Sequence, residues 1–263
     1  MAYEKLKLET QGAIQIITLS DPATMNAASV EMADELGSAF RHANADPVVR
    51  AIVLTGEGRG FCSGANLSPG GSGAAGGGMR DAGSSLEKVY NPLVTFAREM
   101  STPLVTAVNG AAAGVGCSLA LLGDLIVAGE SAYFLQAFRR IGLVPDGGST
   151  YLLPRMIGRA RAMEMAMLGE RVLAPQALEW GLINRCVPDA ELMPTAMALA
   201  EALASGPASL GMTRQLIWGS LDTGWSEQLH KEAVAQTTAG RTEDFGEGVA
   251  AFLGKRKAEF KGR

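Results

Sequence analysis

The chain has 263 residues, of which 47% are hydrophobic and 19% are charged, and its formal net charge is −4. This composition predicts a folded domain with a sizeable core and excludes general disorder. The acidic balance, with no basic stripe interleaved with aromatic residues, argues against nucleic acid as a partner. Three cysteines without paired spacing, no signal-peptide pattern and no apolar run of ~18 residues predict a soluble, cytoplasmic protein without a membrane span.

Apolar strands alternate with helices through the first half of the chain. The strands are predicted at residues 4–9, 13–19, 50–56, 104–108 and 124–128. The helices are predicted at residues 29–44, 85–100 and 114–122. Ser29 is a suitable N-cap for the first of these helices, and Pro103 ends the second. This order predicts an α/β fold whose strands are mostly buried.

The pattern becomes helical in the last part of the chain. Its helices are expected at residues 147–153, 158–168, 174–180, 189–205, 207–221, 225–239 and 242–256. We expect this helical part to pack on a neighbouring subunit or to cap a ligand site.

Two segments allow more than one interpretation. Residues 69–79 are rich in glycine and could form a linker, but the apolar elements on either side favour a loop that flanks a site. The terminal basic cluster is either a solvated helix end or a phosphate contact for an anionic ligand. It consists of Lys255, Arg256, Lys257, Lys261 and Arg263.

Several common catalytic arrangements are missing from the sequence. The two histidines, His42 and His230, lie in polar helical stretches, and no Gly-x-Ser-x-Gly motif accompanies them. Metal-ligand spacing and the glycine-rich phosphate loops of nucleotide-binding proteins are also missing. We therefore expect neither a triad hydrolase nor a metal site.

Two remaining segments are suited to expose backbone N–H groups. Residues 61–67 follow a strand and a turn, and residues 109–118 open a helix after a buried strand. A helix N-terminus has unpaired N–H groups and a partial positive charge, and small residues let a ligand oxygen approach. If both segments face one cavity, they form an oxyanion hole; either one alone could instead serve close packing of helix on strand.

Asp146 lies in an otherwise uncharged stretch of apolar and small residues. It can cap a helix that begins at Gly147, or it can carry a proton with a pKa raised by the apolar neighbours Phe138, Leu143 and Val144. The two roles conflict, because capping N–H groups lower the pKa of a carboxylate. The local sequence leaves both roles open.

Three motifs in order resemble the crotonase superfamily of enoyl-CoA hydratases and isomerases: FCSGANL, VNGAAAGVGCSLALLGDLIVAG and GLVPDGGSTYLLPRMIGRARAMEMAMLGE. The early segment DPATMNA and the tail GVAAFLGKRKAEFKGR are similar too, so the resemblance covers essentially the whole chain. It implies a spiral of ββα units with an acyl-CoA site at residues 1–195. It also implies a C-terminal helical region, residues 196–263, that mediates contacts in a homotrimer or a dimer of trimers.

The resemblance further implies roles for individual residues. The backbone N–H groups of Ala65 and Val115 would hold the thioester oxygen of an acyl-CoA and stabilise the charge that develops on an enolate. Other substrate contacts are implied for Met25, Ala27, Gly64, Asn66, Leu67, Gly114, Ser118, Phe138 and Pro145. Coenzyme A would be part of the substrate, so no cofactor and no metal are expected.

The hydratases of this family use two glutamates, and the chain carries neither. Ser118 and Phe138 take their positions when the sequence is aligned through the Asn109-Gly110 motif. Asp146 instead lies where some isomerases, including those of phenylacetyl-CoA degradation, carry a catalytic carboxylate. One carboxylate suffices for an allylic shift, because it removes a proton from one carbon and returns it two carbons along.

We therefore predict an acyl-CoA isomerase that shifts a double bond, or acts on a ring epoxide or oxepin, with Asp146 as general acid/base. An enoyl-CoA hydratase is the alternative among enzymes, and a non-catalytic acyl-CoA-binding trimer is the alternative of another class. A related branch uses an aspartate here as a nucleophile on aromatic acyl-CoAs. That chemistry needs a histidine base, which the predicted helix at residues 85–100 does not contain.

Overall fold

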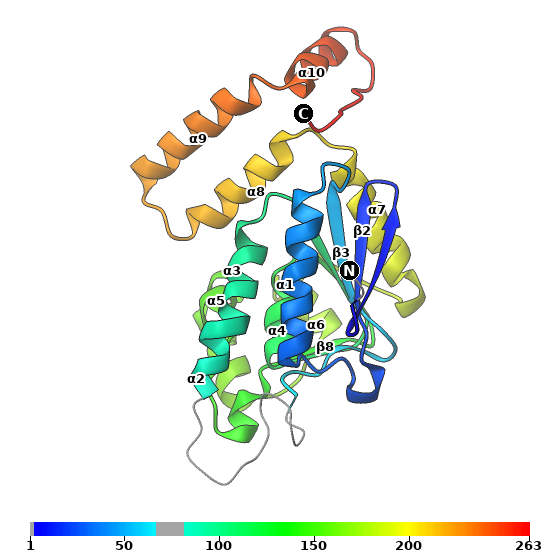
Figure 1. The fold of residues 1–263 in the computed structure, drawn as a ribbon. Coiled ribbons are helices and arrows are strands. Elements are labelled where there is room, and N and C mark those ends of the chain that lie inside the picture. Colours follow the sequence, from blue (N-terminus) through cyan, green and yellow to red (C-terminus); the bar gives the residue numbers. More distant parts are fainter. Residues whose placement is uncertain (1–2, 67–81) are drawn as a thin grey trace.

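The computed structural model describes residues 3–66 and 82–263 (Figure 1). The glycine-rich segment at residues 69–79, expected to be a loop beside the site, lies outside the described residues. Figure 1 shows an α/β body with helices on both faces of a sheet, from which the last three helices extend. The predicted α/β class is confirmed.

A large sheet of six strands forms the centre of the body. Its strands, in spatial order, are β1 (Leu6–Gln11), β2 (Ile14–Leu19), β3 (Ala51–Gly56), β5 (Leu104–Val108), β7 (Leu125–Gly129) and β10 (Arg185–Val187). β1 and β2, at the strands predicted for residues 4–9 and 13–19, form an antiparallel hairpin, and every other neighbouring pair is parallel. The strands predicted at residues 50–56, 104–108 and 124–128 are confirmed as β3, β5 and β7.

A second, smaller sheet was not predicted. It consists of β4 (Gly60–Cys62), β6 (Ala111–Ala113), β8 (Tyr133–Leu135) and β9 (Val172–Leu173). β4, β6 and β8 are parallel, and β9 is antiparallel to β8. Each of the chain's successive turns therefore adds one strand to the large sheet and one to the small sheet, in the pairs β3–β4, β5–β6 and β7–β8. A helical segment follows each pair, as in the ββα spiral that the resemblance implies.

The helices agree closely with the predicted ranges. They are α1 (Val30–Ala45), α2 (Ala82–Ser85), α3 (Asn91–Glu99), α4 (Val115–Ala120), α5 (Ser149–Leu168), α6 (Ala174–Glu179), α7 (Leu192–Ala204), α8 (Ser209–Ser220), α9 (Trp225–Ala239) and α10 (Glu243–Leu253). The predicted N-cap is confirmed, because the Ser29 side chain accepts a hydrogen bond from Met32 N at 3.2 Å.

Two helical predictions need correction. The two helices expected at residues 147–153 and 158–168 are one element, α5, which bends at Gly158, where φ is +76°. The single helix expected at residues 85–100 is divided into α2, a π-helical turn at Leu86–Tyr90, and α3.

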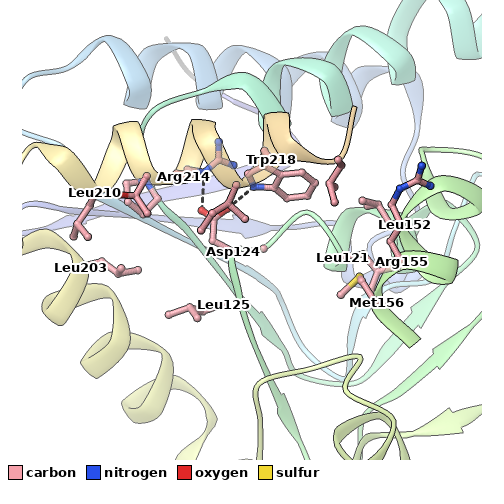
Figure 2. A pocket seen from close by; sticks show the side chains of 15 residues that line it. Leu121, Asp124, Leu125, Leu152, Arg155, Met156, Leu203, Leu210, Arg214 and Trp218 are labelled. Atoms are coloured by element: carbon pink, nitrogen blue, oxygen red, sulfur yellow. Dashed lines mark hydrogen bonds and ion pairs between the residues drawn. The ribbon is translucent and has the colours of Figure 1, made fainter. Parts of the chain in front are cut away.

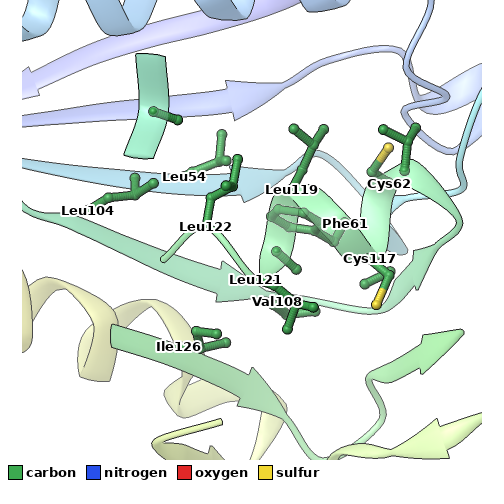
Figure 3. Close-up of a cluster of buried hydrophobic side chains, with 14 of the residues drawn as sticks. Leu54, Phe61, Cys62, Leu104, Val108, Cys117, Leu119, Leu121, Leu122 and Ile126 are labelled. Carbon is green, nitrogen blue, oxygen red and sulfur yellow. The ribbon is translucent and has the colours of Figure 1, made fainter. Parts of the chain in front are cut away.

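The core lies on both faces of the large sheet. One face contributes Leu54 and Leu104 to a cluster that α1, α3 and α4 complete (Figure 3). The other face contributes Val53 and Val105, against which α7 packs with Ala200. Each large apolar side chain buried in this way contributes roughly 1.5–3 kcal/mol to stability. The predicted division at residues 195/196 falls inside α7; that division stays a prediction.

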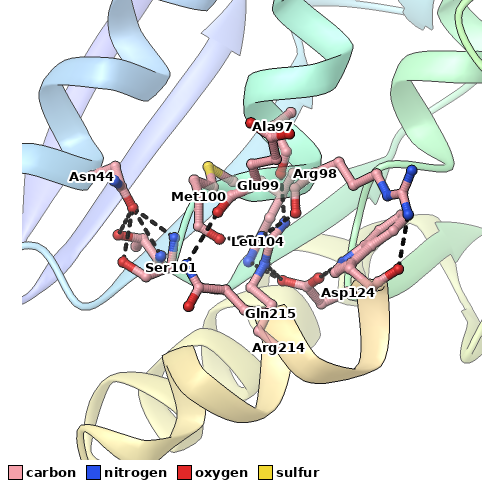
Figure 4. A network of polar contacts seen from close by, with 12 residues as sticks. Asn44, Ala97, Arg98, Glu99, Met100, Ser101, Leu104, Asp124, Arg214 and Gln215 are labelled. Atoms are coloured by element: carbon pink, nitrogen blue, oxygen red, sulfur yellow. Dashed lines mark hydrogen bonds and ion pairs between the residues drawn. The ribbon is translucent and has the colours of Figure 1, made fainter. Parts of the chain in front are cut away.

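A buried arginine fastens α8 to the body (Figure 4). The Nε of Arg214 donates to Asp124 at 2.7 Å, and its NH2 group donates to the Ala97 carbonyl at 2.6 Å. Its NH1 group donates to the carbonyls of Arg98 and Met100. This one side chain satisfies the C-terminal carbonyls of α3 and thereby fixes where the last helices leave the core.

Candidate active site

Four segments of the chain converge on a cavity of 270 Å³. They are the residues after β4, the π-helical turn, the start of α4, and the segment between β8 and α5. The lining residues are Ser63, Gly64, Ala65, Ser85, Leu86, Tyr90, Gly114, Val115, Ala137, Phe138, Arg140, Ile141, Leu143 and Asp146. Six of the residues predicted for the site therefore line one cavity: Gly64, Ala65, Gly114, Val115, Phe138 and Asp146.

The segment after β4 bends toward the small sheet at Gly64. This residue has a φ of +106°, and a Cβ atom there would meet the Ala113 carbonyl oxygen at 3.0 Å. The Gly64 carbonyl accepts a hydrogen bond from Ala28 N at 2.8 Å, which fixes the bend. Within the described residues, the N–H of Ala65 donates no backbone hydrogen bond, so it is available to a ligand in the cavity.

The start of α4 forms the opposite wall. Gly114 is the N-cap residue, with a φ of +54°, and its N–H donates to the Leu135 carbonyl at 2.8 Å. Val115 is the first residue of the helix, and its N–H has no acceptor among the described backbone groups. A Cβ atom on Gly116 would lie 2.7 Å from the Cβ of Cys62, so the same helix also packs closely on β4. Close packing of the helix and an N–H without a described backbone acceptor, predicted as alternatives, occur here together.

Asp146 contributes a carboxyl group to this cavity. Its Oδ1 is buried and has no hydrogen-bond partner among the described residues. Burial raises the pKa of the carboxyl from its ordinary value near 3.8 to about 6. Of the three apolar neighbours predicted to cause this, Phe138 and Leu143 line the cavity. Val144 does not line the cavity, and 79% of it is exposed to solvent.

The alternative role of Asp146 as a helix cap is wrong. The N-cap position of α5 belongs to Gly148, and no side chain caps this helix. The backbone carbonyl of Asp146, in contrast, accepts three hydrogen bonds: from Ser118 Oγ and Ser149 Oγ, each at 2.9 Å, and from Ser149 N at 3.1 Å. The backbone of the residue is therefore held firmly, while its Oδ1 has no partner among the described residues.

The two positions of the hydratase glutamates have different surroundings. Phe138 contributes an apolar wall of the cavity and is 6% exposed. Ser118 is fully buried behind the wall, where its hydroxyl bonds to Asp146. Neither supplies an ionisable group. Pro145 is half-buried next to Asp146 but does not line the cavity.

Met25 and Ala27 lie beside the site rather than in it. The Met25 carbonyl accepts from Ser63 N at 3.0 Å, which joins this segment to the cavity wall. Asn26 holds the segment, because its buried amide donates to the Glu57 and Gly60 carbonyls at 2.9 and 2.8 Å. Asn66 is half-buried just beyond the lining residues. Leu67, also predicted for the site, lies outside the described residues.

Several lining residues were not predicted. Leu86 and Tyr90 belong to the π-helical turn, and Arg140 and Ile141 belong to a 3-10 turn at Ala137–Ile141. Tyr90 is oriented by its hydroxyl, which donates to the Ala28 carbonyl at 2.7 Å. The sequence offers no signal for them except the apolar face of the predicted helix, because their approach depends on how the turns fold back.

A larger cavity, of 410 Å³, lies between α5, α7 and α8 (Figure 2). Its wall is mainly aliphatic, and its acid, Asp124, is paired with Arg214 and accepts from Trp218 Nε1 at 2.7 Å. It therefore offers no acid–base group comparable to Asp146. In the described part of the chain, no cluster of three or more histidine, cysteine or carboxylate side chains is arranged to hold a metal. No described helix is long and apolar enough to cross a bilayer.

Comparisons with known proteins define the class. A family model described as enoyl-CoA hydratase/isomerase matches residues 9–263. The 1,2-epoxyphenylacetyl-CoA isomerase of Escherichia coli (strain K12) is 43% identical over 251 residues, which cover 95% of each chain. A probable enoyl-CoA hydratase of Rhodobacter capsulatus is 43% identical over 264 residues, which cover 100% of each chain.

Solved structures agree with this result. Enoyl-CoA hydratase subunit I from Geobacillus kaustophilus HTA426 has a TM-score of 0.91 and 34% identity, over 99% of each chain. The fold is therefore that of the crotonases. The chain belongs to the enoyl-CoA hydratase/isomerase family.

Proposed function

We propose that the chain is an acyl-CoA isomerase that shifts a double bond, or acts on a ring epoxide or oxepin, with Asp146 as general acid/base. One observation carries the proposal: the Asp146 carboxyl lines the cavity, has an unpartnered Oδ1 and has a pKa of about 6. Such a group can both take up and release a proton near neutral pH.

The proton transfer can be written in two steps. On a 3-enoyl-CoA, the Asp146 carboxylate removes a proton from C2, the electron pair of that C–H bond forms a C1=C2 double bond, and the carbonyl π pair moves onto the thioester oxygen. The thioester carbonyl then forms again, the double bond shifts to C2=C3, and the protonated Asp146 returns its proton to C4. The N–H groups of Ala65 and Val115 would hold the oxygen while it carries negative charge, and each such donor lowers the barrier by ~3–4 kcal/mol.

The acyl group would bind against the apolar part of the cavity wall. Phe138, Leu143 and Ile141 supply a hydrocarbon surface there, which suits an unsaturated alkyl chain or a phenylacetyl-derived ring. The similarity to an isomerase of 1,2-epoxyphenylacetyl-CoA supports including the ring substrates.

Hydration of an enoyl-CoA is the second candidate. Its support is the equally identical relative named as a probable enoyl-CoA hydratase. The chemistry of the site favours isomerisation, because water addition by the two-glutamate scheme needs two ionisable groups. Ser118 and Phe138 at those positions supply none.

The test compares wild type, Asp146→Asn and the surface control Asp46→Asn on 3-enoyl-CoA and phenylacetyl-derived substrates. Removing the general acid/base is expected to lower kcat by at least about 100-fold, while KM changes little and the control keeps wild-type rates. Proton exchange with deuterium oxide should be lost together with isomerisation. Wild-type protein that hydrates 2-enoyl-CoA without isomerising would favour the hydratase. Protein that binds acyl-CoA but catalyses neither reaction nor exchange would identify a binding protein.

The proposal includes a homotrimer or a dimer of trimers assembled through the C-terminal helices. Its support is the large apolar side chains that α8, α9 and α10 expose, among them Ile217, Trp225 and Phe252 at 64%, 78% and 83% exposure. Apolar side chains exposed together on successive helices are typical of a protein–protein contact when they form one patch. Light scattering during size-exclusion chromatography measures the assembly, and a monomer would contradict this part.

A further inference from the structure

The hydrogen bond between Ser118 and Asp146 joins the two catalytic walls of the cavity. Ser118 lies on α4, three residues after Val115, and is fully buried. Its Oγ donates to the Asp146 carbonyl at 2.9 Å across 28 residues of sequence. The other bonds to this carbonyl come from Ser149, only three residues away, so they shape the turn locally without tying it to α4.

The backbone on either side of this bond is in close contact. A Cβ atom added to Gly147 would lie 2.7 Å from the Cβ and 3.1 Å from the Oγ of Ser118. Real side chains do not tolerate such an approach, so position 147 has no room for a side chain beside Ser118.

We propose that Ser118 is a positioning residue, which holds the backbone of Asp146 against α4 and so sets the carboxyl in relation to the Val115 N–H. The inference rests on the proposed function, in which these two groups act on the same acyl-CoA. A proton carrier and an oxyanion donor must both meet one substrate, and a misplacement of about 1 Å can cost 100-fold in rate. Ser118 connects them within a single helical turn.

How the loss of this hydrogen bond affects the pKa of Asp146 depends on the groups that surround its carboxyl. Among the described residues that line the cavity, the other charged or titratable groups are Arg140 and Tyr90, bonded to the carbonyls of Gly169 and Ala28. On α4, the buried Cys117 is hydrogen-bonded to the side chain of Gln136, and burial raises the pKa of its thiol to about 12. None of these groups shifts the pKa of Asp146, which is raised by burial alone. A loosened turn admits water and lowers that pKa.

The test measures isomerisation by the full chain carrying Ser118→Ala, across pH. We expect kcat to fall about tenfold with KM changed less than about twofold, because the acid is misplaced rather than substrate binding lost. The acid limb of the kcat profile should move to lower pH. Thr106→Val is the matched control: Thr106 is equally buried, and its hydroxyl donates to the Ala120 carbonyl at the other end of α4, at 2.9 Å. Thr106→Val should keep the acid limb of the wild-type kcat profile.

A second pair of variants tests the contact from the turn. Gly147→Ala should reproduce the Ser118→Ala profile, whereas Gly181→Ala, after α6 and away from the cavity, should not. Both glycines have positive φ, but a Cβ atom on Gly181 meets nothing within 4 Å. The inference is wrong if Ser118→Ala keeps both the kcat and the acid limb of the wild type. It is also wrong if Thr106→Val loses as much kcat as Ser118→Ala and its acid limb moves to the same pH. Asp146→Asn with full isomerase activity would instead overturn the proposed function itself.

Discussion

Gly148 takes the N-cap position of α5 only two residues after Asp146, yet the Asp146 carboxyl makes no capping bond. Gly147 and Gly148 both have positive φ, at 58° and 83°, and the turn they form separates the carboxyl from the N–H groups of the helix. A carboxylate that accepted those bonds would have a lowered pKa. The two glycines thus allow an acid beside a helix N-terminus to keep a pKa of about 6.

The first prediction concerns the pH dependence of the reaction. The carboxyl must be ionised to remove a proton, so kcat/KM, which reports the free enzyme, should rise with pH through about 6, the pKa of Asp146. Initial rates at substrate concentrations well below KM, between about pH 4.5 and 8.5, measure this limb. A limb near the ordinary value of an aspartate, about 4, would contradict the buried, unpaired state of the carboxyl.

The second prediction concerns stability. The pKa of Asp146 is about 6 in the folded chain, against about 3.9 when unfolded, so ionisation opposes folding. This cost is absent below about pH 4 and complete above about pH 6. Asp146→Asn, which cannot ionise, should therefore be more stable than wild type at pH 7.5 by about 1–3 kcal/mol, with little difference near pH 4. Urea unfolding at the two pH values measures this.

Asp244 provides a control of opposite sign. Burial alone would raise the pKa of its carboxyl, but hydrogen bonds from the backbone N–H groups of Lys261, Ala208 and Gly262 outweigh burial and lower it. Its ionised form therefore stabilises the fold at neutral pH, and that stability is lost as pH falls through its lowered pKa. Asp244→Asn should be destabilised at pH 7.5. If both variants were stabilised, or both destabilised, at pH 7.5, the result would contradict the pKa directions assigned to Asp146 and Asp244.

The sequence predicted the elements whose signal is local. The apolar runs of β3 and β5 and the Ser29 cap of α1 each depend on neighbouring residues alone. The small sheet could not be predicted this way. β4, β6 and β8 have three residues each, and Ala111–Ala113 carries no strand preference. These strands exist because the spiral places successive turns of the chain beside one another.

The same limit applies to the site. Motif resemblance predicted residues that line the cavity after β4, at the start of α4 and in the segment before α5. It could not decide between the two roles of Asp146, because the decision depends on the φ angles of Gly147 and Gly148. Nor could it show that Ser118, an apparent gap in the hydratase pattern, bonds to the Asp146 backbone. Both depend on the tertiary structure.

The third prediction concerns the packing of α4 on β4. In Gly116→Ala the new methyl group would press on the Cys62 backbone, with the Cys62 Cβ at 2.7 Å and Sγ at 2.8 Å. The helix must move, which should cost about 1–3 kcal/mol of stability and displace the Val115 N–H, so kcat should fall as well. Gly219→Ala, on α8 with nothing within 4 Å, should instead be stabilised by about 0.5–1 kcal/mol. Thermal unfolding and isomerase rates of both variants test the contrast, and equal stability changes would contradict it.

The fourth prediction concerns the buried arginine that holds α8. Arg214→Ala leaves the Asp124 carboxylate without its ion pair and leaves the carbonyls of Ala97 and Arg98 without their guanidinium donors (Figure 4). Loss of one partner from a buried ion pair costs about 3–5 kcal/mol of folding stability. The matched variant Arg256→Ala breaks a solvent-exposed pair with Glu247 and should cost far less stability than Arg214→Ala. Because α8 continues into α9 and α10, Arg214→Ala should also weaken any assembly through these helices, whereas Arg256→Ala should fold and assemble as wild type. Unfolding curves at several protein concentrations separate the two effects, since only a loss of assembly depends on concentration.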